Sequence, residues 1–121
     1  MECAQKVADL NKNENVKFVE DEFATNLSLN GQKYDVVIFN PPYVVTSKDE
    51  LSDAQEKKGI EASWAGGEDG TEVLLQVIPQ IKKILSEKGV FYLLLIQENL
   101  KVIGVFETLG FKWSVVMKRE V

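Results

Sequence analysis

Histidine is absent from this 121-residue sequence, and cysteine occurs only once, at Cys3. Without histidine, the chain lacks the usual general base and the commonest metal ligand of proteins. A single cysteine can form neither an internal disulfide nor a zinc site, which fits an intracellular protein. We therefore predict a cytosolic or nuclear location and a chemistry that uses no bound metal.

The sequence also lacks long apolar runs, an excess of basic residues and any internal repeat. No run approaches the length of a membrane span and no signal peptide is visible, so no membrane partner is expected. The formal net charge of -5 argues against a non-specific nucleic-acid binder, which needs a basic face. With 45% hydrophobic and 27% charged residues the composition is globular, and the length allows one domain at most, over residues 1–121.

The most informative stretch begins as a strand and stops abruptly at Asn40. Residues Val36–Phe39 form an unbroken apolar run, which predicts a central strand covered on both faces. Pro41 and Pro42 cannot donate hydrogen bonds to a neighbouring strand, so the strand has to end there. Ligands bind at the carboxyl ends of strands in open α/β sheets, and a chance strand terminator is the alternative interpretation.

A turn of this composition suits the binding of a planar nitrogen-bearing group. The Asn40 side-chain oxygen can accept one of the two N–H hydrogens, and a proline carbonyl can accept the other. Tyr43 offers a flat surface for the plane of the group. Such a cradle directs the nitrogen lone pair toward an electrophile that is already activated, so positioning and electrostatics would do most of the catalysis.

Asn40-Pro41-Pro42-Tyr43 resembles the signature of class I S-adenosylmethionine-dependent methyltransferases that act on planar nitrogens. A second stretch, Gly59–Gly70, together with Val44-Val45-Thr46, is similar to the HemK-type enzymes. It matches the eukaryotic and archaeal branch, which methylates the glutamine of the release factor's Gly-Gly-Gln loop. The two stretches stand in the same order and at the same spacing as in that family.

The resemblance implies a function, a cofactor and partners. The substrate would be the glutamine side-chain amide of a translation release factor, and the methyl donor S-adenosylmethionine. Asn40 and the Pro41 carbonyl would hold the amide, with Pro42 completing the turn and Tyr43 supporting the plane. An acidic residue approaches the adenine of the cofactor, and Asp21 is the matching position. The cofactor set is therefore Asp21, Glu22 and Asn40. A small zinc-binding activator protein would form a heterodimer with the chain.

The sequence departs from the family pattern before the motif. The family begins with a strand, a Gly-rich turn and a second strand, and none of these is recognisable here. The last strand of the family sheet also lies beyond the end of the match. We therefore expect a single, incomplete methyltransferase domain of the α/β class, with a partial Rossmann-like sheet of mostly parallel central strands and flanking helices. The isolated chain should bind cofactor poorly and show no measurable methylation.

Periodicity predicts the remaining elements. Helices are expected over Met1–Asn11, Thr71–Lys88 and Asn99–Leu109, with a kink or break near Gln76 caused by Pro79, and with stops at Gly89 and Gly110. Short strands are expected at Val16–Val19, Val90–Ile96 and Trp113–Met117. The strand Val90–Ile96 should lie parallel beside the strand that ends at Asn40. If the family's first two strands are absent, Val16–Val19 loses its neighbours and the sheet has an open edge at Ile38.

Alternatives to glutamine methylation stay open. The motif also fits adenine-N6 methylation of a nucleic acid, against which the acidic charge and the second stretch argue. A protein lysine is a further possible acceptor. A catalytically inactive fragment, or a binding module that uses the exposed sheet edge, is a hypothesis of a different class, motivated by the missing Gly-rich turn.

Overall fold

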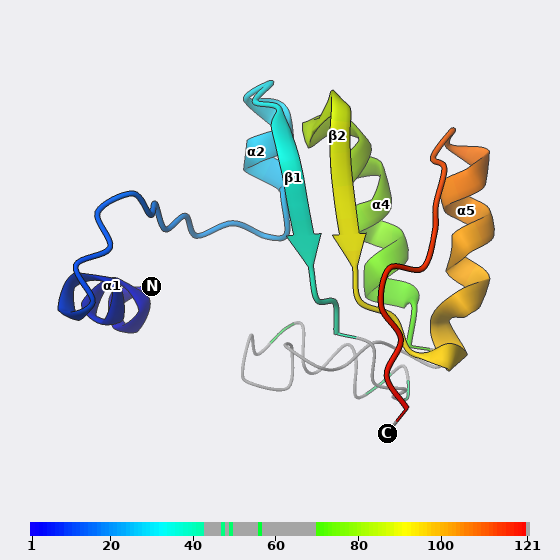
Figure 1. The fold of residues 1–121 in the computed structure, drawn as a ribbon, viewed down its shortest axis with the longest axis horizontal. Coiled ribbons are helices and arrows are strands. Elements are labelled where there is room, and N and C mark those ends of the chain that lie inside the picture. Colours follow the sequence, from blue (N-terminus) through cyan, green and yellow to red (C-terminus); the bar gives the residue numbers. More distant parts are fainter. Residues whose placement is uncertain (43–46, 48, 50–55, 57–69, 121) are drawn as a thin grey trace.

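The structure is a computed structural model, and it describes residues 1–42, 47, 49, 56 and 70–120. The helices and strands follow in the order α1 (Glu2–Leu10), α2 (Thr25–Leu29), β1 (Tyr34–Phe39), α4 (Glu72–Ile84), β2 (Leu85–Leu93), the 3-10 helix η2 (Gln97–Val102) and α5 (Ile103–Thr108). Figure 1 shows two parallel strands side by side, with α1 set apart from the rest by an extended segment. None of the helices in the described ranges is long and apolar enough to cross a membrane.

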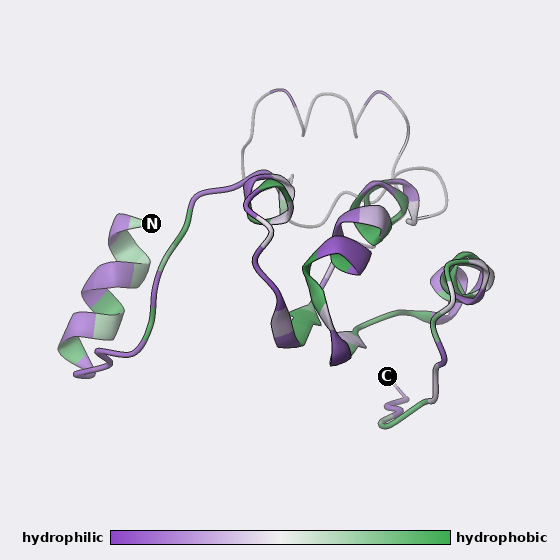
Figure 2. Cartoon of the chain, turned by 90° about the horizontal axis from the view of Figure 1, so that it is seen from above, coloured by the Kyte–Doolittle hydropathy of each residue, from purple (hydrophilic) through white to green (hydrophobic). Residues whose placement is uncertain are grey.

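The two strands pair in parallel, with Val36 opposite Val90 and Phe39 opposite Leu93. This confirms the predicted α/β class and the predicted parallel neighbour. A strand–helix–strand connection places the second strand parallel to the first and packs the helix against one face of the sheet. Here α4 is that helix. Figure 2 shows α2 and α4 on the same side of the strands. Both strands therefore end at the same edge of the sheet.

The hydrophobic core lies between this helix layer and one face of the sheet. It consists of two groups of buried side chains on either side of α4. The first group is Ala24, Val77, Ile81 and Ile84, and the second is Leu74, Ile78, Val102 and Phe106. Phe39 and Phe91 project from the strands against both groups. Because α4 touches α2 through one group and α5 through the other, it is the element that organises the described fold.

The opposite face of the sheet is not covered by any described element. Strand side chains alternate between faces. Val37 and Phe39 are half-buried against the helices, whereas Val36 and Ile38 are exposed. The prediction that this strand is covered on both faces is therefore wrong for the described residues. The apolar run shows that both faces can be buried, but it does not reveal whether a second layer is present.

The helix predicted over Thr71–Lys88 is shorter than expected. It runs without a break through Pro79 and ends at Ile84, because Leu85 turns to extended backbone and joins β2. Gly89 therefore lies inside a strand and does not end the helix. After Leu85 the register of the strands shifts, and regular pairing resumes at Val90. The polar residues before Gly89 offer no apolar contact that would extend the helix along the core.

Two of the predicted strands are absent from the described residues. Val16–Val19 and Trp113–Met117 are irregular, and apart from the half-buried Phe18 their apolar side chains are exposed. A strand needs a neighbour for its backbone groups, and neither segment has one. The helix at the N-terminus is confirmed as α1. The helix expected over Asn99–Leu109 is present as η2 followed by α5, and Gly110 ends it with a φ of 89°.

Candidate active site at the carboxyl ends of the strands

The turn after β1 exposes the polar side chain of Asn40, while the two prolines that follow it are buried. The Phe39 carbonyl accepts a hydrogen bond of 3.2 Å from the Leu94 amide, which is the last rung between the strands. Asn40 follows with an exposed side chain, and Pro41 and Pro42 are both buried. The fixed ring geometry of the two prolines makes this turn stiff. An accessible amide is thus held at the carboxyl edge of the sheet.

The matching turn after β2 holds a buried asparagine that sequence reasoning missed. Asn99 is fully buried, and its side-chain oxygen accepts the Ile96 amide at 3.3 Å. The Asn99 amide donates in return to the Ile96 carbonyl at 3.0 Å. These bonds fix the start of η2 at the same edge as Asn40. The available signal was its place three residues after the predicted strand Val90–Ile96, at the third position of η2, where a side chain can reach back to the first amide as in a capping box.

The carboxylate of Asp21 is engaged with the start of α2. Its two oxygens accept the Asn26 amide at 3.1 and 3.0 Å, and one of them also accepts the Leu27 amide at 3.2 Å. Free amides at a helix start favour an anion in this position. The neighbouring side chain of Glu22 is exposed. Within the described structure, Asp21 therefore acts as a cap for α2.

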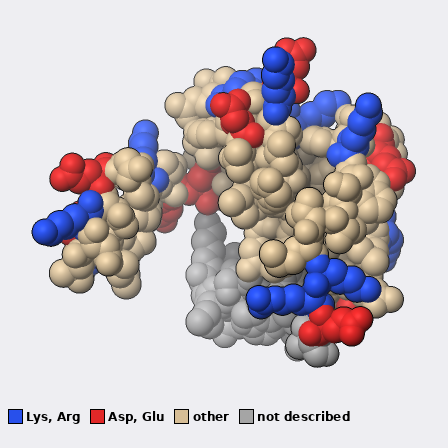
Figure 3. Space-filling view, in the orientation of Figure 1, with Lys and Arg blue, Asp and Glu red and all other residues tan. Residues whose placement is uncertain are grey.

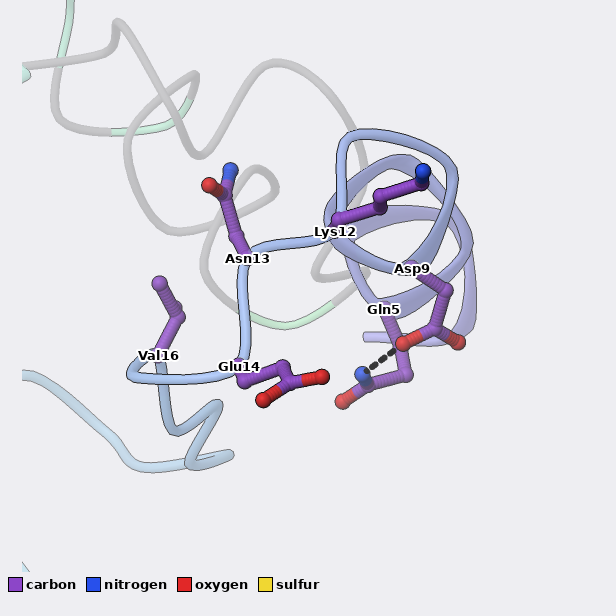
Figure 4. Close-up of a pocket in the computed structure, with 6 residues that line it drawn as sticks. All are labelled: Gln5, Asp9, Lys12, Asn13, Glu14 and Val16. Atoms are coloured by element: carbon purple, nitrogen blue, oxygen red, sulfur yellow. Dashed lines mark hydrogen bonds between the residues drawn. The ribbon is translucent and has the colours of Figure 1, made fainter.

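The described residues of this edge do not by themselves fit S-adenosylmethionine. A nucleoside ligand needs a concave site that buries most of its surface. Asp21 faces the amides of α2, and Glu22 and Asn40 are exposed. A shallow hollow of about 440 Å³ lies instead beside α1 (Figure 4). Its lining is polar and consists of Gln5, Asp9, Lys12, Asn13, Glu14 and Val16. It is formed by α1 and the segment after it, so it is not the predicted cofactor site.

Tyr43 and the stretch Val44-Val45-Thr46 lie outside the described residues, as does Gly59–Gly70 apart from its last residue. The role predicted for the Tyr43 ring therefore stays a prediction. Gly70 is buried and has a φ of 73°, a conformation that favours glycine. Among residues 1–42, 47, 49, 56 and 70–120, no group of three or more His, Cys, Asp or Glu side chains could hold a metal ion.

Comparison with known proteins assigns the family. The family model described as Eco57I restriction-modification methylase matches residues 2–102 of this chain. The chain belongs to this family of methylases, which are methyl-transferring enzymes. Its relatives confirm the resemblance to the HemK-type branch.

Three relatives are named for related activities. Methyltransferase HEMK2 of Homo sapiens is 38% identical over 91 residues, which are 74% of this chain and 41% of the relative. The eRF1 methyltransferase catalytic subunit mtq2 of Schizosaccharomyces pombe is 37% identical over 127 residues, or 97% of this chain and 53% of the relative. A protein of Methanocaldococcus jannaschii named as an N5-glutamine methyltransferase is 33% identical over 125 residues, or 100% and 58%. The chain thus spans between about two fifths and three fifths of these relatives.

Proposed function

We propose that this chain takes part in the methylation of a glutamine side-chain amide in a translation release factor. The observation that supports this most directly is the turn after β1, where Asn40 is exposed above two buried prolines. The Asn40 oxygen can accept one amide hydrogen, and the Pro41 carbonyl can accept the other. Two fixed acceptors orient the nitrogen lone pair away from the turn, which is the arrangement that N-methylation needs.

The relatives support the choice of substrate. The Schizosaccharomyces pombe relative is named for eRF1, and relatives in Burkholderia pseudomallei and Xanthomonas campestris are named for the glutamine of ribosomal protein uL3. The uL3 names state a protein glutamine as the acceptor, and the mtq2 name states eRF1 as the methylated protein. We propose a protein glutamine as the acceptor for the present chain, and the release factor as the protein that carries it, because mtq2, which is 37% identical to this chain, is named for eRF1.

Methyltransferases generally use S-adenosylmethionine, and we propose it as the methyl donor here. Because Asp21 faces the amides of α2 and the described hollow lies beside α1, the proposal for this chain concerns the amide-holding side of the reaction. The zinc-binding activator protein implied by the resemblance belongs to the same proposal. The name of mtq2 as a catalytic subunit is compatible with a partner of that kind.

A titration followed by nuclear magnetic resonance tests the acceptor side without requiring turnover. The titrant is a release factor carrying the Gly-Gly-Gln loop, and the matched control replaces its glutamine with glutamate. We expect the Asn40 side-chain amide signals and the amides of Val36–Phe39 to shift with the glutamine form alone. The Asn40→Asp variant removes the amide signals, and its strand amides should no longer respond. Equal shifts with the glutamate form would contradict the proposal.

Adenine-N6 methylation is the second candidate, because the matching family model is described as a restriction-modification methylase. An adenine-containing oligonucleotide and the same oligonucleotide without adenine serve as further titrants. Shifts that need adenine and exceed those with the release factor would favour the nucleic-acid substrate. The acidic composition, with 19 acidic and 14 basic residues, favours the protein substrate.

A further inference from the structure

The uncovered face of the sheet is a continuous apolar surface. It is formed by the side chains of alternate residues on the two strands and of the residue directly after β2, namely Val36, Ile38, Val90, Tyr92 and Leu94, and we call it the open face. Ile38 is 77% exposed, the largest fraction among these. Figure 3 shows this side of the molecule, where the surface over the strands is largely uncharged and the charged side chains lie toward its rim. Apolar surfaces of this kind mark interaction sites.

Helix α1 carries an apolar stripe that is also uncovered. Cys3, Val7 and Leu10 follow one another at spacings of four and three residues, so they share one side of the helix. Cys3 is exposed, Val7 is 54% exposed and Leu10 is 83% exposed. Lys6 and Glu2 form an ion pair of 3.3 Å. Each of these two residues directly precedes a residue of the stripe in the sequence, so the pair lies beside the stripe. Ala8 on the same helix is buried, whereas the stripe of Cys3, Val7 and Leu10 is left exposed by the described residues.

The stripe and the open face match in size and in charge. A helix of nine residues is about 14 Å long and about 10 Å wide. The regularly paired run from Val36 to Phe39 is about 13 Å long, and two adjacent strands with their side chains are about 10 Å wide. Neither surface brings a charge into the contact. One α1 is therefore large enough to cover one open face and to supply a second layer over the described strands.

The position of α1 favours a second copy as the source of that layer. Asp21 fixes the end of the segment after α1 to the amides of α2, on the helix-covered side of the sheet. From there the segment leads away past β1, so α1 stands clear of its own open face (Figures 1 and 2). We propose that two copies of this chain associate with two-fold symmetry, the α1 of each lying on the open face of the other. Two equivalent contacts then form for one loss of translational freedom.

Sedimentation of the full 121-residue chain at rising concentration gives the first test. We expect a dimer at high micromolar concentration. The Leu10→Asp variant should weaken self-association by about tenfold or more, since a charge would enter an apolar contact. The matched control is Leu29→Asp, because Leu29 is 76% exposed and lies on α2, behind the sheet. A monomer at every concentration, or equal weakening by both variants, would overturn the proposal.

Chemical linking then identifies which surfaces meet. The wild-type chain has Cys3 as its one thiol. It is mixed with a chain that carries Cys3→Ser and Ile38→Cys, so that its one thiol lies on the open face, and a short bismaleimide linker is added. We expect a linked heterodimer by mass spectrometry. The control partner carries Cys3→Ser and Leu29→Cys, which places an equally exposed thiol on the opposite side.

The outcomes of this experiment distinguish a contact between two copies from a contact within a single chain. A heterodimer with the open-face thiol and none with the control thiol supports the proposal. A single chain carrying both Cys3 and Ile38→Cys reports the alternative. If it links internally while the mixed chains do not link, α1 covers its own sheet and the proposal fails. Equal linking of the two partner chains, or no linking at all, also overturns it.

Discussion

The two faces of this sheet are formed by alternating residues of the same two strands, yet the described helices cover only one face. On one face Phe39, Phe91 and Leu93 pack against α4 and its neighbours. On the other face Val36 and Ile38 project into solvent. Both faces carry large apolar side chains, so composition alone does not distinguish them. The comparison shows that burial is a property of the layer on top of a strand, and that it cannot be read from the strand itself.

The largest effect is expected from an isoleucine beneath the covered face. Ile78 lies on α4 and is 0% exposed. Changing it to alanine leaves a cavity between α4, α5 and the strands, because the surrounding helices can close only part of the space. We expect the Ile78→Ala variant to lose about 2–5 kcal/mol of unfolding free energy in urea denaturation. A loss below about 1 kcal/mol would mean that this layer does not form the core.

A smaller effect is expected where α2 is joined to α4. The Gln80 side chain accepts the amide of Ala24 at 3.0 Å and donates to the Thr25 hydroxyl at 3.0 Å. Ala24 is buried, so the Gln80→Ala variant leaves its amide without this acceptor. We expect a loss of about 1–3 kcal/mol in the same measurement. Gln76→Ala is the control, since Gln76 is exposed on the same helix. Equal losses from the two variants would assign the effect to the helix and exclude the link.

The parts of the fold that sequence reasoning predicted depend on local pattern. The core of β1 is a run of β-branched and aromatic residues that ends at Asn40, and this pattern predicts a strand. The parallel neighbour follows from the handedness of the strand–helix–strand connection. The amphipathic stripe of α4 likewise identifies its buried side, from Val73 to Ile84. Each of these features is encoded within a few consecutive residues.

The parts that sequence reasoning missed depend on distant residues. Helix α2 has only five residues, and it is held by the Asp21 carboxylate and by Gln80, which lies 55 positions after Thr25. Gly89 could stop a helix or enter a strand, and pairing of Leu85 with Tyr34 places it in the strand. The segments Val16–Val19 and Trp113–Met117 have strand-forming residues but no neighbouring strand among the described residues. Local sequence does not specify whether a partner is present.

The candidate site likewise combines features that depend on local sequence with features that depend on distant residues. The exposed position of Asn40 above buried prolines follows from the strand and from proline geometry, and both are local. The burial of Asn99 and the use of Asp21 as a helix cap depend on how separate elements come together. Sequence reasoning assigned Asp21 to the cofactor, and that assignment stays a prediction. The described structure gives the same carboxylate three amide hydrogen-bond contacts within α2.

A third variant separates the capping role of Asp21 from a role in ligand binding. The Asp21→Ala change removes the acceptor for the Asn26 and Leu27 amides, so we expect a loss of about 1 kcal/mol in unfolding free energy. Asp21→Asn keeps a side-chain oxygen and should recover most of that loss. Glu22→Ala is the control at an exposed neighbour. If Asp21→Ala leaves stability unchanged, the carboxylate does not support α2, and a ligand role gains weight.

The smallest effect on stability is expected on the open face, where Ile38 can be compared with the buried isoleucine Ile78 beneath the covered face. Ile38 matches Ile78 in size and chemistry, but most of its side chain is already in water. Truncation therefore removes little buried area, and we expect Ile38→Ala to change the unfolding free energy by no more than about 0.5 kcal/mol. The measurement belongs on the Leu10→Asp background, in which the proposed contact between copies is weakened. A loss as large as that of Ile78→Ala would show that a layer already covers this face within one chain, and the contrast between the two faces would disappear.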